Sequence, residues 1–556
     1  MDGQYTTQRA SKKDHRWDRA QVAELLSRAQ DFPELSQRDF ARQYHVPRST
    51  FQHWTGRLEA LQQTTGNPEL ACFLESPAGR AFLHRIMVVL HLVFAVEANC
   101  GLRRLEQFLR LTGLDSFVGA SYGTQQKFAK FMEQELAAFG EREQERLAPH
   151  MPAREITVCE DETFHPEPCL VAIEPQSGFI VLEAYREQRD RETWNDSLST
   201  ALEGLPVQVI QTVSDEARAL IAHARCLGAH HSPDLFHVQQ ETSAATSLAL
   251  RGQAHKAEQA VAQVQKAAKQ AVAERDACLA DCPQSSATRE LTHQAEVATE
   301  QVAQAEAKAE ICRQRQKRAR EARRGLGEDY HPFDINTGIP CDAKTVQDRM
   351  NHRFDQLDEI AREAELSPSA GKRLAKARRV LVAMTATIAM FWGWIEDRLR
   401  TLSLSPEQER SFLEHLLSAA YLSLAASKAK SAQRRQEIEV VAEQRRQMAR
   451  DGPLGDMPSE EWKCLEGIAT DWAALFQRSS SCVEGRNGHL SLWHHSQHRL
   501  NPSRLRALTV LANYFHRRPD GTNAAQRFFR APTSDLVQWL LARLPLPVRP
   551  ARFCAA

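Results

Sequence analysis

Residues 155–185 read EITVCEDETFHPEPCLVAIEPQSGFIVLEAY, and this stretch decides the fold of the chain. It contains three apolar segments rich in β-branched residues, at Ile156–Phe164, Cys169–Glu174 and Phe179–Tyr185. Gln176–Gly178, between the last two segments, has the composition of a hairpin turn. We therefore expect three short strands that follow one another in a single sheet.

Three consecutive acids, Glu160, Asp161 and Glu162, interrupt the first of these strands. Burying a charge without a partner is costly, so acids on a sheet-forming segment need an explanation. Either they face water on an edge strand, or one of them is the first ligand of a metal-dependent phosphoryl-transfer site. Because side chains alternate along a strand, Glu160 and Glu162 would point away from the face that Asp161 occupies. Asp161 is therefore the expected ligand.

The segments that follow alternate between helix and strand. They are a helix, a strand, a second helix and a fifth strand or strand-to-helix junction, at Arg191–Leu202, Val207–Val213, Ala217–Leu227 and Asp234–Val238. This is the element order of an RNase H-like α/β domain. The first and fourth strands are neighbours in that topology, and each ends near an aspartate, Asp161 or Asp215. The two carboxylates are therefore expected to converge.

The composition of the 556 residues is that of an ordinary multidomain chain. Lys+Arg and Asp+Glu balance at 71 each, so only local charge can indicate a nucleic-acid partner. The 12 cysteines are scattered, which favours reduced thiols over a disulfide framework. The N-terminus carries no apolar signal core, and the most apolar run, Val380–Ile395, is short for a bilayer span. We expect a soluble intracellular protein in which this run is a buried helix.

Residues 1–65 are predicted to form a DNA-binding domain with a helix-turn-helix over residues 20–61. Ser36 is a suitable helix cap, and His45–Pro47 supplies the turn before the second helix. The alternative is a plain helical hairpin. In a helix-turn-helix, the side chains available for phosphate or base contacts would be Arg48, Ser49, Thr50, Gln52 and His53.

Residues 66–150 are predicted to be helical. They would form either a second DNA-binding motif, with Tyr122–Lys130 as its recognition helix, or a packing and dimerisation layer. Residues 151–245 would form the first part of the RNase H-like catalytic core.

An all-helical insertion is predicted at residues 246–475, because the composition there changes to Ala, Gln, Glu and Lys. Gln253–Ala277 and Ser286–Arg324 have the pattern of an antiparallel helical hairpin. The second arm ends in Cys312–Gly325, with seven basic residues and one acid. This basic run is either a solvated helix face or an arm that contacts phosphates.

Residues 476–535 are predicted to close the core, followed by a tail at 536–556. From Gly485 to Ala556 the chain has eleven arginines, no lysine and two aspartates. Arginine suits planar, bidentate contact with phosphate, so Arg486, Arg499 and Arg504 are candidate DNA contacts. Glu484 stands where a helix begins, a position at which the helix field stabilises a carboxylate.

Four short motifs resemble those of DDE transposases of bacterial insertion sequences. They are Cys159-Glu-Asp161-Glu, Val213-Ser-Asp215, Asp234-Leu-Phe-His237-Val and Ser481-Cys-Val-Glu484-Gly-Arg-Asn487. The resemblance implies that Asp161, Asp215 and Glu484 form the catalytic triad and hold two Mg²⁺ or Mn²⁺ ions. Two-metal phosphoryl transfer needs such hard oxygen ligands around ions roughly 4 Å apart. By the same resemblance, Asp234, His237 and Asn487 would line the site.

The expected fold is thus multidomain α and α/β, with a helix-turn-helix and an RNase H-like core interrupted by a helical insertion. The resemblance implies a transposase of the bacterial cytoplasm and nucleoid that cleaves and joins double-stranded DNA. Its partners would be the element ends, the target DNA and further copies of the chain as a homodimer or higher oligomer, with no membrane. The alternatives are an RNase H-like nuclease without strand transfer and a transposase-derived DNA-binding protein without catalysis.

Overall fold

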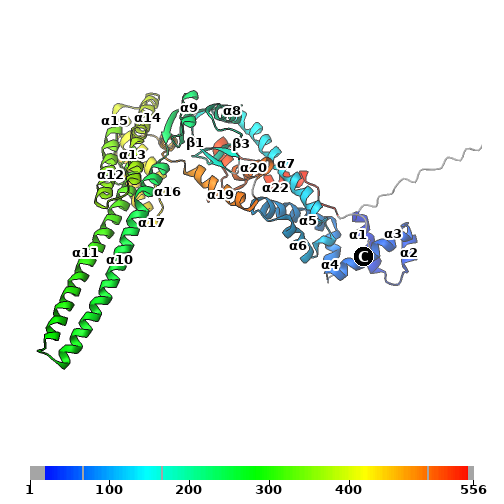
Figure 1. The fold of residues 1–556 in the computed structure, drawn as a ribbon. Coiled ribbons are helices and arrows are strands. Elements are labelled where there is room, and N and C mark those ends of the chain that lie inside the picture. The colour runs from blue at the N-terminus through cyan, green and yellow to red at the C-terminus, as the bar shows by residue number, and fades with distance from the viewer. Residues whose placement is uncertain (1–18, 66–67, 165–166, 498–499, 549–556) are drawn as a thin grey trace, which may run out of the picture. The chain divides into compact units, whose positions relative to one another are not determined.

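The structure, a computed structural model, describes residues 19–65, 68–164, 167–497 and 500–548. The chain divides into two compact units (Figure 1). Unit 1 comprises Met1–Met151 with Trp493–Ala556, and unit 2 comprises Pro152–Leu492. Each unit is described by itself below. The described part of the chain is mostly helical with one mixed sheet, as expected for a multidomain α and α/β protein.

Unit 2 contains a five-stranded sheet with the order β3-β2-β1-β4-β5. The three strands predicted from residues 155–185 are confirmed as an antiparallel meander, and β4 and β5 continue the sheet in parallel with β1. The predicted neighbourhood of the first and fourth strands is also confirmed. The bounds are β1 (Arg154–Phe164), β2 (Pro168–Glu174), β3 (Phe179–Tyr185), β4 (Val207–Ser214) and β5 (His230–Pro233).

The fifth strand ends earlier than the strand alternative for Asp234–Val238 requires. β5 stops at Pro233, and the carboxylate of Asp234 accepts a hydrogen bond of 2.8 Å from the backbone N–H of Phe236. This bond caps a helix, α10, that begins at Leu235. The prediction of a strand there was wrong, and the strand-to-helix junction was the correct alternative.

One face of the sheet is covered by α8 (Arg191–Leu202) and α9 (Arg218–Cys226). Val158 and Leu170 from the sheet pack with Trp194 and Leu220 from the helices, and all four are buried. Burial of each such side chain contributes about 1.5–3 kcal/mol. This apolar layer holds β1 in place from behind.

The opposite face of β1 carries Glu155, Thr157, Cys159 and Asp161, as alternation along a strand requires. The indole Nε1 of Trp394 donates to Glu155 at 2.9 Å, and the thiol of Cys159 donates to the carbonyl of Ser479 at 3.7 Å. The helical block and the segment leading into α19 (Ser481–Gln497) therefore lie along this face.

The predicted helical hairpin is confirmed, and Figure 1 shows its two helices running side by side. They are α10 (Leu235–Asp281) and α11 (Ser286–Asp329). The first arm begins directly after the sheet, so the predicted domain boundary at residues 245/246 falls inside one continuous helix. The middle part of the hairpin buries small side chains between its arms, including Ala254, Ala257 and Ala309.

The remaining helices of unit 2 form a block around a large apolar core that includes Phe354, Met384 and Phe391. The helical insertion predicted for residues 246–475 is confirmed as helical here, with two helices separated at Val380 and residues 406–451 divided into several segments. The bounds are α12 (Ala343–Glu363), α13 (Pro368–Arg379), α14 (Leu381–Leu399), α15 (Pro406–Ser411), η4 (Phe412–Leu417), α16 (Ser418–Ser427), α17 (Ala432–Asp451) and α18 (Ser459–Leu475).

Two segments of the described residues, Pro77–Glu97 and Pro368–Leu399, are long and apolar enough to cross a membrane by length and composition. About half of the most apolar part of each is buried inside the protein. The second segment contains α14, which buries Met384, Ile388 and Ile395 in the helical block. The prediction that Val380–Ile395 is a buried helix agrees with this packing.

Unit 1 begins with four helices, α1 (Arg19–Asp31), α2 (Gln37–Gln43), α3 (Arg48–Thr65) and α4 (Pro68–Glu75). The side chain of Ser36 caps α2, and the turn into α3 passes through His45, whose φ is +54°. Phe40, Val46 and Phe51 form the buried core between the two helices. The predicted pair of helices joined by a short turn is therefore present.

The rest of unit 1 combines residues from both ends of the chain. The N-terminal elements are α5 (Pro77–Leu90), η1 (His91–Glu97), α6 (Leu102–Leu111), η2 (Leu114–Ser116), α7 (Tyr122–Leu147) and η3 (Ala148–His150). The C-terminal elements are α20 (Pro502–Val510), η5 (Leu511–Phe515), α21 (Ala524–Phe529) and α22 (Leu536–Arg543). The predicted closing part of the core, 476–535, is thus divided between the two units: residues up to Leu492 belong to unit 2, whereas α20 and the elements after it belong to unit 1, where α20 and α22 pack on α7.

Candidate active site

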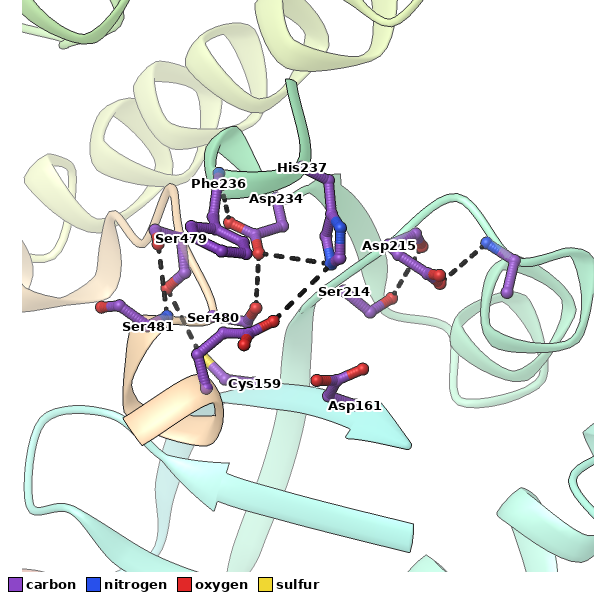
Figure 2. Close-up of polar contacts among 12 residues, drawn as sticks. Cys159, Asp161, Ser214, Asp215, Asp234, Phe236, His237, Ser479, Ser480 and Ser481 are labelled. Atoms are coloured by element: carbon purple, nitrogen blue, oxygen red, sulfur yellow. Dashed lines mark hydrogen bonds and ion pairs between the residues drawn. The ribbon is translucent and has the colours of Figure 1, made fainter. Parts of the chain in front are cut away.

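Asp161 lies on β1 just beyond the last residue that pairs with β4. That last pair is Cys159 with Val213, whereas β1 itself continues to Phe164 beside β2. Asp161 is therefore near the end of β4. The sequence analysis expected it at the end of its own strand, but β1 continues for three more residues. Figure 2 shows Asp161 and His237 facing each other across the site, with Asp215 to one side.

The carboxylate of Asp161 is held by two hydrogen bonds. Oδ1 accepts from the backbone N–H of Glu162 at 2.8 Å, and Oδ2 accepts from Nδ2 of Asn487 at 2.9 Å. Burial raises the pKa of Asp161 to about 6, and the negative charges of Glu484 and Asp215 add to this shift. The N–H of Glu162 and the imidazole of His237 act in the opposite direction. A carboxyl group that senses two further carboxylates is typical of a cation site or a proton-transfer site.

The two acidic neighbours of Asp161 point to the other face of the sheet, as predicted. Glu160 is fully buried, with Oε1 at 3.3 Å from Nε2 of His223, and burial raises its pKa. Glu162 accepts a hydrogen bond of 3.0 Å from the indole of Trp194 and pairs with Arg189 at 2.9 Å. Both acids are occupied behind the sheet, so Asp161 is the member of the triplet that faces the site.

Asp215 follows the last residue of β4 and is half-buried. Its Oδ1 accepts a hydrogen bond of 2.9 Å from the backbone N–H of Ala217, at the start of α9. This bond turns the carboxylate toward the helix N-terminus. The position at the end of β4 is the one that the sequence predicted.

Glu484 lies in the first turn of α19, and 32% of its side chain is exposed. Its Oε1 is 4.0 Å from Nε2 of His237. Burial raises the pKa of Glu484 and the charge of Asp234 adds to the shift, whereas His237 lowers it. Glu484 therefore reaches the space near Asp161 from a helix more than three hundred residues later in the chain.

Asp234 and His237 lie in the first turn of α10 but have different roles. Asp234 is buried, caps the helix and accepts a hydrogen bond of 2.6 Å from Oγ of Ser480. It thereby ties α10 to the residue that precedes α19. The ring of His237 is 34% exposed and lies 3.8 Å from Asp234 and 4.0 Å from Glu484. His237 is therefore accessible from the site and is not buried in the core.

Asn487 follows Glu484 by three residues, so both side chains lie on the same side of α19. Its Nδ2 donates to Asp161, whereas its buried Oδ1 has no hydrogen-bond partner among the described residues. An unpartnered buried amide oxygen beside a carboxylate is a free hard-oxygen donor. The helix thus delivers two oxygen-bearing groups to the same place.

Arg486 does not fit its predicted role as a phosphate contact. Its guanidinium donates two hydrogen bonds, of 2.6 and 2.7 Å, to the carboxylate of Glu183 on β3. The Glu183 side chain is fully buried and that of Arg486 is 8% exposed. Glu183 shares a cross-strand row with Val171 and Asp161, so the pair fixes α19 to the face of the sheet that carries Asp161. This pairing could not be predicted, because the two residues are far apart in the sequence.

Arg504 is also engaged within its own unit. It pairs with Glu133 of α7 at 2.6 Å and donates to the carbonyl of Ala95 at 2.6 Å, with 13% of its side chain exposed. It therefore joins α20 to α7 and η1, and the prediction of a DNA contact is corrected. The third candidate, Arg499, lies outside the described residues.

The basic run on α11 is largely paired with neighbouring helices. Arg315 and Arg318 form ion pairs with Glu363 at 3.3 and 3.0 Å, and Arg323 donates to Ser243 at 2.8 Å. These contacts favour a structural helix face over a phosphate-contacting arm. In the predicted DNA-binding helix α3, four of the five candidate side chains are exposed and Thr50 is half-buried; the exposed ones are Arg48, Ser49, Gln52 and His53.

The donor set is suitable for a hard cation, although it is open. Among the described residues, no three His, Cys, Asp or Glu side chains are gathered closely enough to hold a metal ion. Mg²⁺ is commonly held by one or two carboxylates, with waters and substrate phosphates completing its coordination. Asp161, Asp215, Glu484 and the free oxygen of Asn487 meet that requirement if DNA supplies further ligands. The expected pair of ions remains a prediction.

Comparison with known proteins gives a partial family match. Residues 412–555 match a family of unknown function, DUF6399. The matched part includes α19, and with it Glu484 and Asn487. No curated protein matches the chain. The chain is therefore similar to DUF6399 over its C-terminal quarter, and this similarity assigns no activity.

Proposed function

We propose that this protein is a Mg²⁺-dependent DNA strand-transfer enzyme, a transposase of the DDE type, with Asp161, Asp215 and Glu484 as its catalytic acids. The observation that carries the proposal is the placement of the acids: Asp161 lies just beyond the last β1–β4 pair, Asp215 directly follows β4, and α19 brings Glu484 and the Asp161-bound Asn487 to the same place. Burial raises the pKa of Asp161, and the charges of Glu484 and Asp215 add to this shift. Acids 54 and 323 residues from Asp161 in the sequence thus act on its carboxyl group. Structural ion pairs join opposite charges, whereas a gathering of like charges is typical of a functional site.

The sheet supports an RNase H-like core as the framework of this site. An antiparallel meander followed by two parallel strands, in the order β3-β2-β1-β4-β5, agrees with the topology expected from the element order. It brings the end of β4 beside β1, so residues 161 and 215 both lie just beyond the last pair of these two strands. The helical insertion then returns the chain to the same place at α19.

The chemistry assigned to these residues is positioning of cations and of the reacting phosphate. When bound, two Mg²⁺ ions supply activation of the attacking water or 3′-hydroxyl and stabilise the leaving oxygen. Asp161, Asp215 and Glu484 would hold them. Asn487 orients the carboxylate of Asp161, and His237 is placed to balance the charge of Glu484. The exposed start of α3 would bind the DNA ends.

The test is DNA cleavage by the full-length protein on labelled duplexes taken from both flanks of its coding region. With Mg²⁺, wild type should cut the ends and join them to target DNA, whereas Asp215→Asn should lose at least a hundredfold in rate. Asp397→Asn, an exposed aspartate in a surface ion pair with Arg400, is the matched control and should behave as wild type. Equal rates for Asp215→Asn and wild type would refute catalysis at this site. Cleavage without joined products would favour the nuclease.

A further inference from the structure

The basic side chains of α11 and α19 that were predicted to bind DNA mostly pair with other residues of the protein. Arg486 is in a buried ion pair, and the basic run of α11 is joined to α10 and α12. A catalytic centre made of three acids still needs positive charge nearby to bind a polyanion. A different element, α13, carries such charge beside the site.

Helix α13 has five cations and no acid in its twelve residues, PSAGKRLAKARR. It buries Ala370, Leu374 and Ala377 against the helical block. Arg378 turns toward α12, where it pairs with Asp355 at 2.8 Å. The other four cations are exposed, and their spacing places them on neighbouring positions of one side of the helix; they are Lys372, Arg373, Lys376 and Arg379.

This basic face borders the candidate active site directly. A cavity of about 280 Å³ is lined by Lys376 and Ala377 together with Asp215 and His237, and the acids Glu216, Asp234 and Glu241 also line it. All of these residues belong to unit 2. A group that enters the cavity therefore meets a catalytic acid and an ammonium group together.

The charge of the face is only partly compensated by the protein. Lys376 and Arg373 share a single carboxylate, that of Glu241, at 2.7 and 2.8 Å. The lysine is 64% exposed in this pair, and its ammonium has three donors, so it can bind a further anion. Within the described part of the chain, no carboxylate lies within ion-pair distance of Lys372 or Arg379. The face therefore has a net positive charge.

We propose that the exposed face of α13, formed by Lys372, Arg373, Lys376 and Arg379, binds the DNA backbone beside the scissile phosphate. Lys376 contacts a phosphodiester at the cavity shared with Asp215. The inference rests on the proposed function for the identity of the ligand, and it assigns the helical insertion the task of holding the strand that is cut. Glu241 keeps Arg373 and Lys376 directed toward the cavity while DNA is absent.

The experiment compares two double variants of the full-length protein. Lys376→Ala/Arg379→Ala removes two cations from the face and leaves Arg373 to pair with Glu241. Lys463→Ala/Arg400→Ala removes the same residue types from other surface positions of unit 2, where each pairs with an exposed acid on its own helix or at its end. Lys463 and Lys376 are equally exposed, at 64%.

Affinity for a labelled duplex from the coding-region flanks is measured over a range of salt concentrations, together with the cleavage rate. The face variant should bind roughly tenfold more weakly and lose about 2 units of salt slope, since each phosphate contact accounts for roughly 0.9 units. The charge-preserving variant Lys376→Arg/Arg379→Lys should restore both values, and the control should match wild type. Equal losses in the face variant and the control would overturn the proposal.

The cleavage measurements separate this inference from the proposed function. If wild type cleaves and Asp215→Asn does not, while the face variant binds and cleaves as wild type does, the α13 assignment fails and the enzyme assignment stands. If wild type binds but never cleaves, and the face variant binds weakly, the enzyme assignment fails and the DNA-binding face stands.

Discussion

At the scale of single residues, the site depends on side chains that hold other side chains. Asn487 provides one of the two hydrogen bonds that hold the carboxylate of Asp161, and the bond between Asp234 and Ser480 helps to tie α10 to the start of α19. Groups of this kind orient metal ligands and are often as important as the ligands themselves. Asn487 is the clearest case, because its only described hydrogen bond goes to a catalytic candidate.

Replacement of Asn487 by Ala should therefore reduce Mg²⁺-dependent cleavage by roughly 10–100-fold. The variant should still bind duplex DNA, since the amide does not lie on the basic face of α13. Rates at several Mg²⁺ concentrations would show whether the apparent affinity for the metal falls. Asn336→Ala, an exposed asparagine that accepts from Arg434, is the control. A wild-type rate for Asn487→Ala would exclude the positioning role.

Buried His91 provides a prediction about pH in unit 1. It bonds to Gln125 at 2.7 Å, and burial lowers its pKa from 6.5 to about 4. The histidine is thus neutral in the folded state while it would take up a proton in the unfolded state. The contribution of this histidine to the free energy of unfolding is therefore fully present above pH 6.5. It decreases by roughly 3 kcal/mol as the pH drops to 4.

Thermal unfolding between pH 4 and 7 would measure this effect. His91→Asn should lower the midpoint at pH 7 and show a weaker dependence on pH than wild type does. Buried His331 of unit 2 also has a lowered pKa, so the difference between variant and wild type is the relevant quantity. Parallel pH curves for the two proteins would contradict the assignment.

At the scale of elements, the position of α19 relative to the sheet decides whether Glu484 can reach Asp161. The buried pair between Arg486 and Glu183 fixes that position, because a charge inside the protein cannot easily leave its partner. The neighbours of the pair along the helix are the two functional candidates, Glu484 and Asn487. A small rotation of α19 would move both.

Breaking this pair by Glu183→Gln should destabilise unit 2 by about 3–5 kcal/mol, because it leaves the guanidinium buried without its counter-charge. The change would appear in chemical unfolding monitored by tryptophan fluorescence, along with slower cleavage. If Arg486 served as a DNA contact instead, Glu183→Gln would leave both stability and cleavage unchanged. Glu460→Gln, in an exposed pair with Lys463, provides the comparison at the surface.

The elements themselves were largely predictable, because their signals are local. The apolar runs and turn residues of 155–185 gave the three strands, and Ser36 gave the start of α2. Asp161, Asp215 and Glu484 could be named from motifs of a few residues. The roles of Arg486 and Arg504 could not be predicted in this way, because they depend on partners distant in the sequence. Both arginines form largely buried ion pairs in the fold, with Glu183 and Glu133.

The basic helix α13 was missed for a related reason. Its charge is no denser than that of the basic run Cys312–Gly325 on α11, and only the three-dimensional arrangement shows which acids each helix meets. Four of the seven cations of the α11 run form ion pairs, with Glu363 and four other acids of the described residues. On the exposed face of α13, two of the four cations form ion pairs, and both share the single carboxylate of Glu241. Local charge in a sequence thus indicates a candidate surface, and the fold decides whether it is available.

At the scale of the whole molecule, unit 2 combines a small sheet with a helical insertion much larger than the sheet itself. The insertion contributes to the site through α10, α13 and the return of the chain to α19. The distal hairpin, which is the part of α10 and α11 between Glu258 and Arg313, differs from these elements. Its described contacts are within the hairpin itself, as for Gln265 with Glu306.

Replacing residues 262–305 with a short Gly-Ser turn should therefore leave the fold of the sheet and the cleavage of DNA ends intact. The remaining hairpin keeps Ala254, Ala257 and Cys312, which pack between its arms. Circular dichroism and the cleavage assay would report on fold and activity. A shortened protein that folds but no longer cleaves would show that the distal hairpin takes part in the reaction.

The central claim is that residues 161, 215 and 484 surround one metal-binding site. Fe²⁺ that replaces Mg²⁺ in the full-length protein–DNA complex generates radicals with ascorbate and peroxide, and these cut the polypeptide backbone near the metal. Mass spectrometry of the fragments should locate cuts close to Asp161, Asp215 and Glu484 in the same sample, and excess Mg²⁺ should suppress all of them. Cuts confined elsewhere, or cuts unaffected by Asp161→Asn and by Mg²⁺, would contradict the account.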